Sequence, residues 1–431
     1  MLAAFSSIFR TPDLRKKVLF ALAILALYRL GAVIPTPGVD YSAVQKCVEL
    51  VEGNSLYGVI NLFSGGALLQ LSIFALGVMP YITASIIIQL LTVVIPRLEA
   101  LKKEGQSGQA KMTQYTRYLT VGLAVLQTTG IIALARTPGR LFQGCEENIV
   151  PNQSIPIILT MILVMTTGTV VVMWFGELIT ERGIGNGMSL LIFASILAGF
   201  PSQFAAIYQS KGTFLLVMVL LVSLVTITLV VYVEQAQRRI PVQYAKRQIG
   251  NKLYGGASTY LPLKVNMAGV IPVIFASSLL YIPQLIVSLS GAESSWAQWI
   301  QRNFTQGTEP AYLLTYFLLI IFFAYFYVAI TFNPIEVADD MKKYGGFIPG
   351  IRPGKPTAEY LNYVLSRLTF PGSLYLAVIA IIPFAGFAFL GVGQNFLFGG
   401  TSLLIMVGVG LDTVKQLQSQ LQQRNYEGFL R

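Results

Sequence analysis

Long apolar runs separated by shorter polar segments recur along the whole chain. Ten of these runs predict membrane-spanning helices, at residues 18–35, 71–95, 118–135, 155–176, 188–208, 213–235, 266–290, 311–332, 372–390 and 396–414. A bilayer core about 30 Å thick needs about 20 helical residues to cross it. Alternating segments of about ten residues, which spanning strands would require, do not occur in the sequence. The pattern predicts an all-α polytopic membrane protein with ten transmembrane helices.

Composition supports this class and narrows the chemistry. Of 431 residues, 54% are hydrophobic and only 11% are charged, compared with about 25% charged in soluble domains. The sequence contains no histidine, which excludes a Ser-His-Asp triad, a Cys-His pair and a histidine metal site. It also lacks a G-x-x-x-x-G-K-[ST] phosphate loop. We therefore expect no histidine metal site and no cofactor, and whatever work the chain does, it does not hydrolyse nucleotide through such a loop.

A glycine-rich segment, ITERGIGNG at residues 179–187, lies between two predicted spans. A phosphate-binding loop would normally follow a strand. We therefore favour a tight turn and a helix that starts at Asn186.

The basic residues predict the orientation. Most Lys and Arg residues fall in segments on the side of the two termini, and the opposite side carries only Lys46, Arg136, Arg140, Lys211 and Arg302. Basic loops stay in the cytoplasm because their translocation is disfavoured. An even number of spans puts both termini on one side. The N- and C-termini are therefore predicted to be cytoplasmic.

The acidic residues bear on the kind of transport. All 19 lie in loops or near the ends of predicted spans, and Glu177, Glu234 and Asp412 are the closest to the lipid. Ion-coupled transporters usually keep an ionisable group near the midplane. A secondary transporter for a small solute remains the main alternative, since unwound backbone carbonyls can also bind sodium. An intramembrane enzyme is disfavoured, because no carboxylate pair or histidine is available.

Two cysteines, Cys47 and Cys145, fall in predicted external loops. An oxidising compartment allows a disulfide between them, but two thiols in separate loops are more often unpaired. Unpaired thiols are the favoured expectation.

Two predicted cytoplasmic loops, 236–265 and 333–371, are longer than a helix connection requires. The positive-inside rule alone can account for their charge. Their length favours a docking surface for a cytosolic body, and the turn Gly350-Ile351-Arg352-Pro353-Gly354 would present one guanidinium at its tip. The basic residues expected to take part are Arg238, Arg239, Lys246, Arg247, Arg352 and Lys355.

One apolar run, residues 56–69, is too short to cross a membrane. Gly65 and Gly66 would end its helix and let the backbone turn. The run suits a re-entrant segment that enters from the external side. The alternative is an amphipathic helix on the outer membrane surface.

Six motifs carry a family resemblance: NLFSGGAL (61–68), MPYITASIIIQLL (79–91), ITERGIGNG (179–187), KVNMAGVIPVIFASS (264–278), GIRPG (350–354) and FGGTSLLI (398–405). Together, and in this order, they resemble the SecY family of protein-conducting channels, in its bacterial-type branch, across essentially the whole chain. The resemblance implies two pseudo-symmetric, inverted five-helix halves, residues 1–209 and 210–431, around a central hourglass pore. It also implies a multi-pass protein of a bacterial-type plasma (inner) membrane.

By the same resemblance, a ring of apolar side chains closes the waist of the pore. It maps onto Val78, Ile82, Met188, Ile192, Ile274 and Ile405. Aliphatic groups suit a pore that must pass any sequence, because fixed polar groups would trap some side chains, and a dry ring excludes water. Ordinary helix packing explains apolar residues at these spacings equally well. Only the family motifs single out these six.

Two further devices are implied by the resemblance. The short run becomes a plug at about residues 57–68, with Tyr57, Asn61, Phe63, Ser64, Gly65 and Gly66. A lateral gate would open between spans 2 and 3 on one side and spans 7 and 8 on the other. Its polar residues would be Thr83, Gln127 and Asn266, whose side chains we expect to hydrogen-bond across the closed seam.

The partners are also implied by the resemblance. They are the SecE and SecG subunits, the SecA motor ATPase, the ribosome at the cytoplasmic loops, signal sequences, unfolded polypeptides and membrane lipids. The expected function is to pass unfolded secretory polypeptides across the membrane and to release hydrophobic segments sideways into the bilayer. Energy would come from the motor or the ribosome.

Overall fold

The computed structural model of the chain describes residues 11–51, 64–137, 145, 147–244, 247–249, 252–254, 258–290, 295–304, 309–390 and 400–427. Its helices are α2 (Pro12–Val33), α3 (Tyr41–Val51), α5 (Met79–Val94), α6 (Pro96–Lys103), α7 (Gln106–Ala135), α8 (Ile155–Arg182), α9 (Gly187–Gln235), α10 (Ile271–Ser290), α11 (Ser295–Phe304), α12 (Pro310–Thr331), α13 (Pro334–Lys343), α14 (Lys355–Leu390) and α15 (Gly400–Glu427). The strands are β1 (Gln237–Tyr244), β2 (Arg247–Ile249), β3 (Lys252–Tyr254), β4 (Ser258–Lys264) and β5 (Gly346–Phe347).

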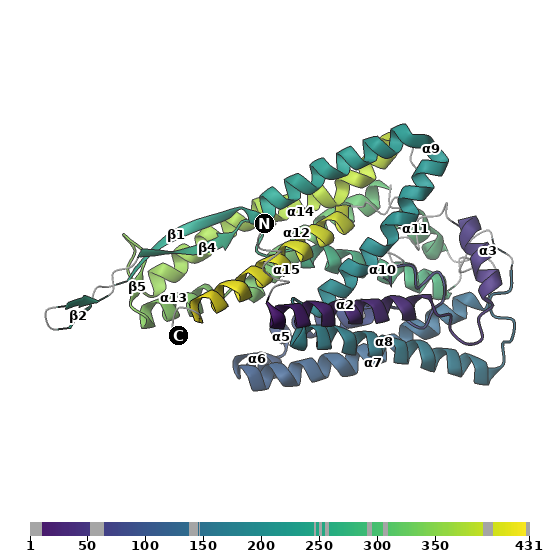
Figure 1. Cartoon of the computed structure of the whole chain (residues 1–431), viewed down its shortest axis with the longest axis horizontal. Coiled ribbons are helices and arrows are strands. Elements are labelled where there is room, and N and C mark those ends of the chain that lie inside the picture. The colour runs from purple at the N-terminus through teal and green to yellow at the C-terminus, as the bar shows by residue number, and fades with distance from the viewer. Residues whose placement is uncertain are drawn as a thin grey trace.

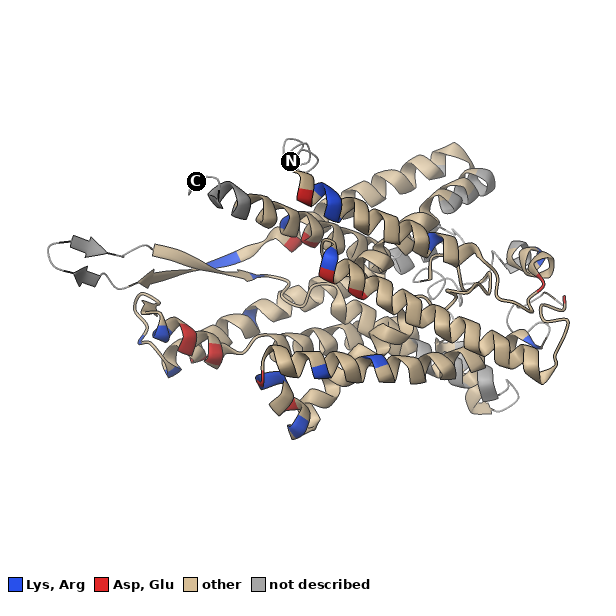
Figure 2. Cartoon of the chain, turned by 60° about the horizontal axis from the view of Figure 1, so that its bottom comes forward, with Lys and Arg blue, Asp and Glu red and all other residues tan. Residues whose placement is uncertain are grey.

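The long helices run roughly side by side along the molecule (Figure 1). Strands β1 to β5 lie at one end, which we call the sheet end, and α3 and α11 lie at the opposite end, which we call the α3 end. Most charged residues of the described chain gather toward the sheet end (Figure 2). The segments that carry most of the Lys and Arg residues in the sequence therefore lie at the same end of the molecule.

The apolar helices agree with the predicted membrane architecture. Each of the ten expected spans overlaps a helix, with both spans between residues 188 and 235 falling in α9. By length and composition, five helices in the described ranges can cross a membrane, within α7, α8, α9, α12 and α14. The count becomes six if α5 and α6, which are bent by 101° at their junction, form one span.

Several helices are longer than their apolar runs. α7 begins at Gln106 rather than at residue 118, α14 begins at Lys355 rather than at 372, and α15 continues to Glu427 rather than ending at 414. A helix satisfies its own backbone hydrogen bonds and can therefore continue beyond the bilayer with polar side chains. Hydropathy detects only the part that meets lipid.

α9 joins two expected spans across a break. Gly212 has φ 79° and ψ 179°, a conformation that only glycine adopts easily, and it interrupts the helical backbone. Figure 1 shows the resulting bend in α9. The break lies close to residues 209 and 210, where the sequence suggested that one half of the chain ends and the other begins.

Two strands, β1 and β4, pair within the segment 236–265, which was expected only as a loop. β1 pairs antiparallel with β4, from Gln237 opposite Lys264 to Gln243 opposite Ser258. β5 pairs with the other edge of β1, so the sheet order is β4-β1-β5. The two long basic segments, 236–265 and 333–371, are therefore joined by one sheet.

This sheet has its own apolar core. Ile240 of β1 and Leu263 of β4 pack with Ile348 and with Leu361 and Val364 of α14. Burial of these side chains holds the two strands against the base of α14, because apolar area is removed from water.

Candidate functional site

The six residues predicted to form the ring lie near the beginning of helices or, for Val78, directly before one. Val78 directly precedes α5 and Ile82 lies in its first turn, while Met188 and Ile192 lie in the first two turns of α9. Ile274 lies in the first turn of α10, and Ile405 in the second turn of α15. Asn186 caps α9, as predicted, because its side chain accepts hydrogen bonds from the backbone N–H groups of Met188 and Ser189.

Five of these six side chains are buried, and one is more exposed. Val78, Ile82, Ile192, Ile274 and Ile405 are all buried, with 0 to 9% of each exposed, and all belong to the largest apolar cluster. Met188 is partly buried and packs against that cluster. The Met188 thioether lies against Gly176 of α8 and fills the space that a side chain at position 176 would occupy. Residues on or next to α5, α9, α10 and α15 thus contribute apolar side chains to one buried cluster.

The expected lateral seam corresponds to a packed contact between helices. α10 packs against both α5 and α7, so segments far apart in sequence meet there. Gln127 is half-buried on α7. Thr83 does not reach across the seam, because its hydroxyl donates to the Met79 carbonyl of its own helix at 3.0 Å.

Asn266 also differs from the expectation of a bond across the seam. Its side-chain amide donates to Glu234 Oε1 at 2.5 Å and to the Gly269 carbonyl at 3.1 Å. Glu234 lies at the end of α9 and is only 8% exposed. A buried carboxylate needs hydrogen-bond donors, and the amide of Asn266 supplies one. The expected seam hydrogen bond is therefore wrong for Asn266 in this structure, because a partner nearer in space binds the amide.

Two hydroxyls that the sequence analysis did not single out lie on the helices of the seam. Thr128 on α7 and Ser278 on α10 are buried, and within the described part of the chain neither side-chain oxygen has a hydrogen-bond partner. Buried polar groups without partners are uncommon and invite a functional explanation. Little in the sequence points to Thr128 and Ser278, since serine and threonine are common in membrane helices.

The residues predicted to form the plug fall partly outside the described part of the chain. Tyr57, Asn61 and Phe63 lie outside them, whereas Ser64, Gly65 and Gly66 are described. Gly65 has φ 64° and Gly66 has φ 93°. Both values lie in the left-handed region that favours glycine, which confirms the predicted turn of the backbone.

The proposed docking residues lie on the joined basic segments. Arg238 and Arg239 are exposed on β1, and Arg352 is exposed in the turn before α14. Gly350 and Gly354 flank this turn with φ 82° and 101°, and the Arg352 carbonyl accepts a hydrogen bond from the Thr357 hydroxyl at 2.9 Å. The turn is thus fixed by its backbone, as its sequence predicted.

The remaining docking residues are less fully described. Lys355 is exposed at the first residue of α14, and Arg247 lies on β2. Lys246 lies outside the described residues. Among the ion pairs of the described chain, none includes Arg238, Arg239, Arg352 or Lys355.

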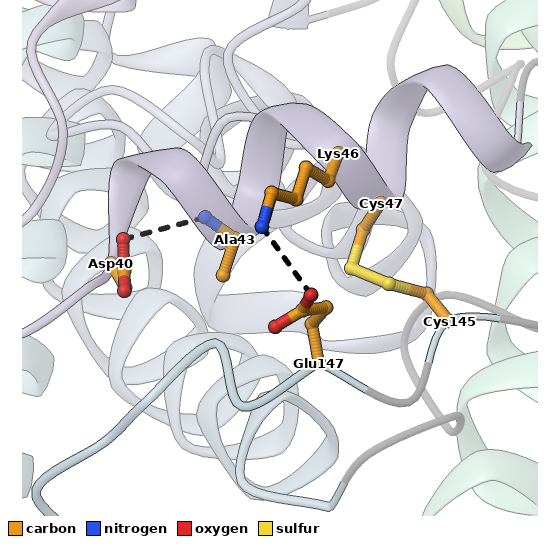
Figure 3. The surroundings of a disulfide bond; sticks show 6 residues. All are labelled: Asp40, Ala43, Lys46, Cys47, Cys145 and Glu147. Carbon is orange, nitrogen blue, oxygen red and sulfur yellow. Dashed lines mark hydrogen bonds and ion pairs between the residues drawn. A yellow bond between two sulfur atoms is a disulfide. The ribbon is translucent and has the colours of Figure 1, made fainter.

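The cysteines are paired, which corrects the expectation of free thiols. Cys47 on α3 and Cys145 form a disulfide across 98 residues of sequence, with their Cα atoms 5.4 Å apart (Figure 3). The Lys46 ammonium also lies 3.5 Å from the Glu147 carboxylate. Pairing depends on the closeness of two loops in space, which their positions in sequence do not reveal.

α3 has further local supports. Asp40 precedes the helix and accepts hydrogen bonds from the Ser42 hydroxyl and from the backbone N–H groups of Ala43 and Ser42, which lowers the pKa of its carboxyl. The backbone N–H of Asp40 donates to the Ile149 carbonyl at 2.9 Å. The helix that precedes the short apolar run is therefore fixed to the segment between α7 and α8.

Comparison with known proteins gives one consistent answer. The sequence model of the SecY family matches residues 72–414. The protein translocase subunit SecY of Streptomyces scabiei is 67% identical over 100% of both chains, and that of Mycobacterium leprae is 61% identical, again over 100% of both.

Solved structures agree on the fold. A protein-conducting channel matches with a TM-score of 0.64 and 18% identity, over 94% of this chain and 91% of that chain. A SecY protein whose plug domain stabilises the closed state of the translocation channel and maintains a membrane seal also matches with a TM-score of 0.64, at 19% identity and the same coverage. Sec61 in the canine ribosome-channel complex from the endoplasmic reticulum matches with a TM-score of 0.59 and 18% identity, again over 94% and 91%. By sequence across its full length, this chain belongs to the SecY family.

Proposed function

We propose that this chain is the central channel subunit of a protein translocase. It passes unfolded secretory polypeptides across the membrane and releases hydrophobic segments sideways into the bilayer. The observation that carries the proposal is the identity of 60 to 67% to protein translocase subunits SecY along their whole length. Membership of this family favours a polypeptide channel over the small-solute transporter that the sequence had left open.

The passage runs between the halves 1–209 and 210–431, through the ring formed by Val78, Ile82, Met188, Ile192, Ile274 and Ile405. The burial of five of these side chains in one apolar cluster supports this role. An apolar constriction stays dry and blocks ions without offering any side chain a fixed polar partner. Met188 adapts most easily to irregular shapes, because its side chain is unbranched and flexible. The same ring then tolerates any passing sequence.

The plug at about residues 57–68 seals the resting channel. The left-handed backbone at Gly65 and Gly66 supports this assignment, because it allows the chain to turn before α5 begins. The lateral gate opens where α10 meets α5 and α7. This region includes Gln127, Thr83 and Asn266. The Thr83 side chain bonds to Met79 of its own helix and the Asn266 side chain to Glu234, so neither bond crosses the gate.

The protein lies in a bacterial-type inner membrane with both termini in the cytoplasm. The sheet end then faces the cytosol, which agrees with its concentration of charge (Figure 2). The channel itself is passive, and SecA or a translating ribosome supplies the energy by docking on Arg238, Arg239, Arg352 and neighbouring basic residues. SecE and SecG complete the complex. A solved ribosome-channel complex of the same fold supports the ribosome as a partner.

A stalled, half-exported polypeptide tests the proposal. A photo-crosslinker is placed at the membrane-embedded position of that polypeptide, and the attachment site on this chain is mapped by mass spectrometry. We expect attachment to Ile82, Ile192, Ile274 or Ile405. Leu221 is the matched control, because this apolar residue is 60% exposed on the outer side of α9.

Two results would contradict the proposal. One is attachment to the lipid-facing control and to none of the ring residues. The other is accumulation of a small solute against its gradient in liposomes that refuse unfolded precursors even when the motor is supplied.

A further inference from the structure

Arg29 is the one charged residue in the apolar part of α2, which runs from residue 18 to the end of the helix at Val33. It lies in α2, four residues before the helix ends at Val33, and its side chain is half-buried. No ion pair of the described chain includes Arg29. A cation inside a membrane segment is costly, and it is usually retained for a function.

The guanidinium of Arg29 is directed at a backbone carbonyl. Its Nη1 atom donates to the Gly65 oxygen at 2.7 Å, across 36 positions of sequence. Such a bond is charge-assisted, and charge-assisted hydrogen bonds are about twice as strong as neutral ones. Gly65 belongs to the segment that leads into α5 and the ring residue Val78. The cation therefore holds the backbone at the point where the short apolar run turns.

A second, neutral contact lies beside the first. The Tyr28 hydroxyl lies 2.8 Å from Ser195 Oγ on α9 and 3.5 Å from the Ser64 carbonyl. Either hydroxyl can donate in the Tyr28–Ser195 pair. Tyr28 can also donate to the Ser64 carbonyl, and Ser195 to the Leu191 carbonyl at 2.9 Å. Tyr28, Ser64 and Ser195 are all buried. The two contacts together connect α2, α9 and the backbone at residues 64 and 65.

Only glycine fits at position 65. A Cβ atom there would lie 2.8 Å from Arg29 Nη1 and 3.0 Å from the Ser195 Cα atom, and its φ of 64° is unfavourable for other residues. The carbonyl of residue 65 can therefore approach Arg29 closely only because the side chain is missing.

We propose that Arg29, supported by the Tyr28–Ser195 pair, is a latch that holds residues 64 and 65 in the closed channel. The latch sets the free energy of opening, and so determines how hydrophobic a signal sequence must be to open the channel. This role rests on the proposed function. Arg29 is a positioning residue, since it acts on the backbone of the plug segment rather than on the polypeptide that passes.

The latch is partly shielded from water, since Tyr28, Ser64 and Ser195 are buried and Arg29 is half-buried. In a water-poor environment the bond between a guanidinium and a carbonyl is strong, because few competing partners are available. Once the channel opens and fills with water, the guanidinium is hydrated and the bond loses its advantage. Ser195 lies one helical turn from the ring residue Ile192, so wetting of the ring also reaches the latch. Hydration of the ring and release of the latch would then occur together, which makes opening more cooperative.

The experiment measures opening with Arg29→Met, which keeps an unbranched apolar stem but removes the guanidinium and its charge. Full-length protein is reconstituted in planar bilayers, and the ion conductance is recorded without any precursor. Export of a precursor with a weakened signal sequence is measured in parallel. We expect about a tenfold or larger increase in the open fraction for Arg29→Met, more export of the weakened precursor, and partial rescue by Arg29→Lys.

Three further variants guard against a simple folding defect. Gly65→Ala leaves Arg29 intact but pushes the carbonyl away, so it should open the channel in the same way. Combining it with Arg29→Met should add little, because both changes break one contact. Leu30→Ala, at a 64% exposed neighbour on the same helix, is the matched control and should stay closed.

The latch is overturned if Arg29→Met and Gly65→Ala both stay closed and keep the wild-type signal threshold while the wild type exports normally. It is also overturned if the effects of the two variants simply add. A wild type that exports no precursor at all would instead overturn the proposed function, and with it this role of Arg29.

Discussion

Removal of the disulfide between Cys47 and Cys145 should lower the stability of the protein. The bond closes a loop of 98 residues that contains α5, α6 and α7. For a freely flexible chain, closure of a loop of about 100 residues is worth about 4.7 kcal/mol through the entropy of the unfolded state. Helices that remain inserted in the membrane restrict that state already. We therefore expect a loss of about 2–4 kcal/mol, within the usual range for a native disulfide.

The assay heats the detergent-solubilised full-length protein and measures the fraction that remains monodisperse by size-exclusion chromatography. Cys47→Ser, Cys145→Ser and the double variant should share one lowered midpoint, because each removes the same bond. A reductant should lower the midpoint of the wild type to that value. It should leave the double variant unchanged, since the chain has only 2 cysteines.

Two results would refute this reasoning. In one, the reductant leaves the midpoint of the wild type unchanged, which would show that closure of the loop contributes nothing. In the other, an impermeant maleimide labels both cysteines of the untreated wild type in full, which would show that the bond is absent from the native protein.

Three other changes have defined outcomes. Asn266→Leu leaves the buried Glu234 carboxylate without its amide donor and should lower the stability of the protein by about 1–3 kcal/mol in the same heating assay. Adding Glu234→Leu should recover most of this stability, and no recovery would contradict the pairing. Gly168→Ala places a methyl group against the Ile73 carbonyl oxygen and should also cost about 1–3 kcal/mol, whereas an unchanged midpoint would mean that this contact can relax freely. Arg352→Glu should weaken ribosome binding and motor-driven export; normal values of both would remove this turn from the docking surface.

The membrane architecture was predictable from the sequence because the bilayer imposes one simple requirement. A segment that crosses it must be apolar over about 20 residues, whatever its neighbours are. The boundaries were less predictable, since α14 begins at Lys355, well before its apolar part. The pairing of β1 with β4 was missed, although Ile240 and Val242 are buried in alternation with exposed neighbours on β1, which is the pattern of a strand with one buried face.

Contacts between distant segments were the least predictable part. The disulfide, the partner of Asn266 and the position of the Met188 thioether against Gly176 all depend on how the helices pack. A single sequence gives the chemical type of each side chain but not which others lie nearby. The turn at Gly65 and Gly66 was predictable, because glycine pairs identify local backbone geometry.

The three-stranded sheet has a mechanical consequence. β5 and the Arg352 turn belong to one segment of the chain, and β1 and β4 belong to another, yet hydrogen bonds between strands connect them. β4 ends at Lys264, and only residues 265–270 separate it from α10, which carries Ile274. The hydrogen-bonded strands therefore join the Arg352 turn at the surface to the start of α10. We expect a force applied at the turn to reach α10 through the sheet.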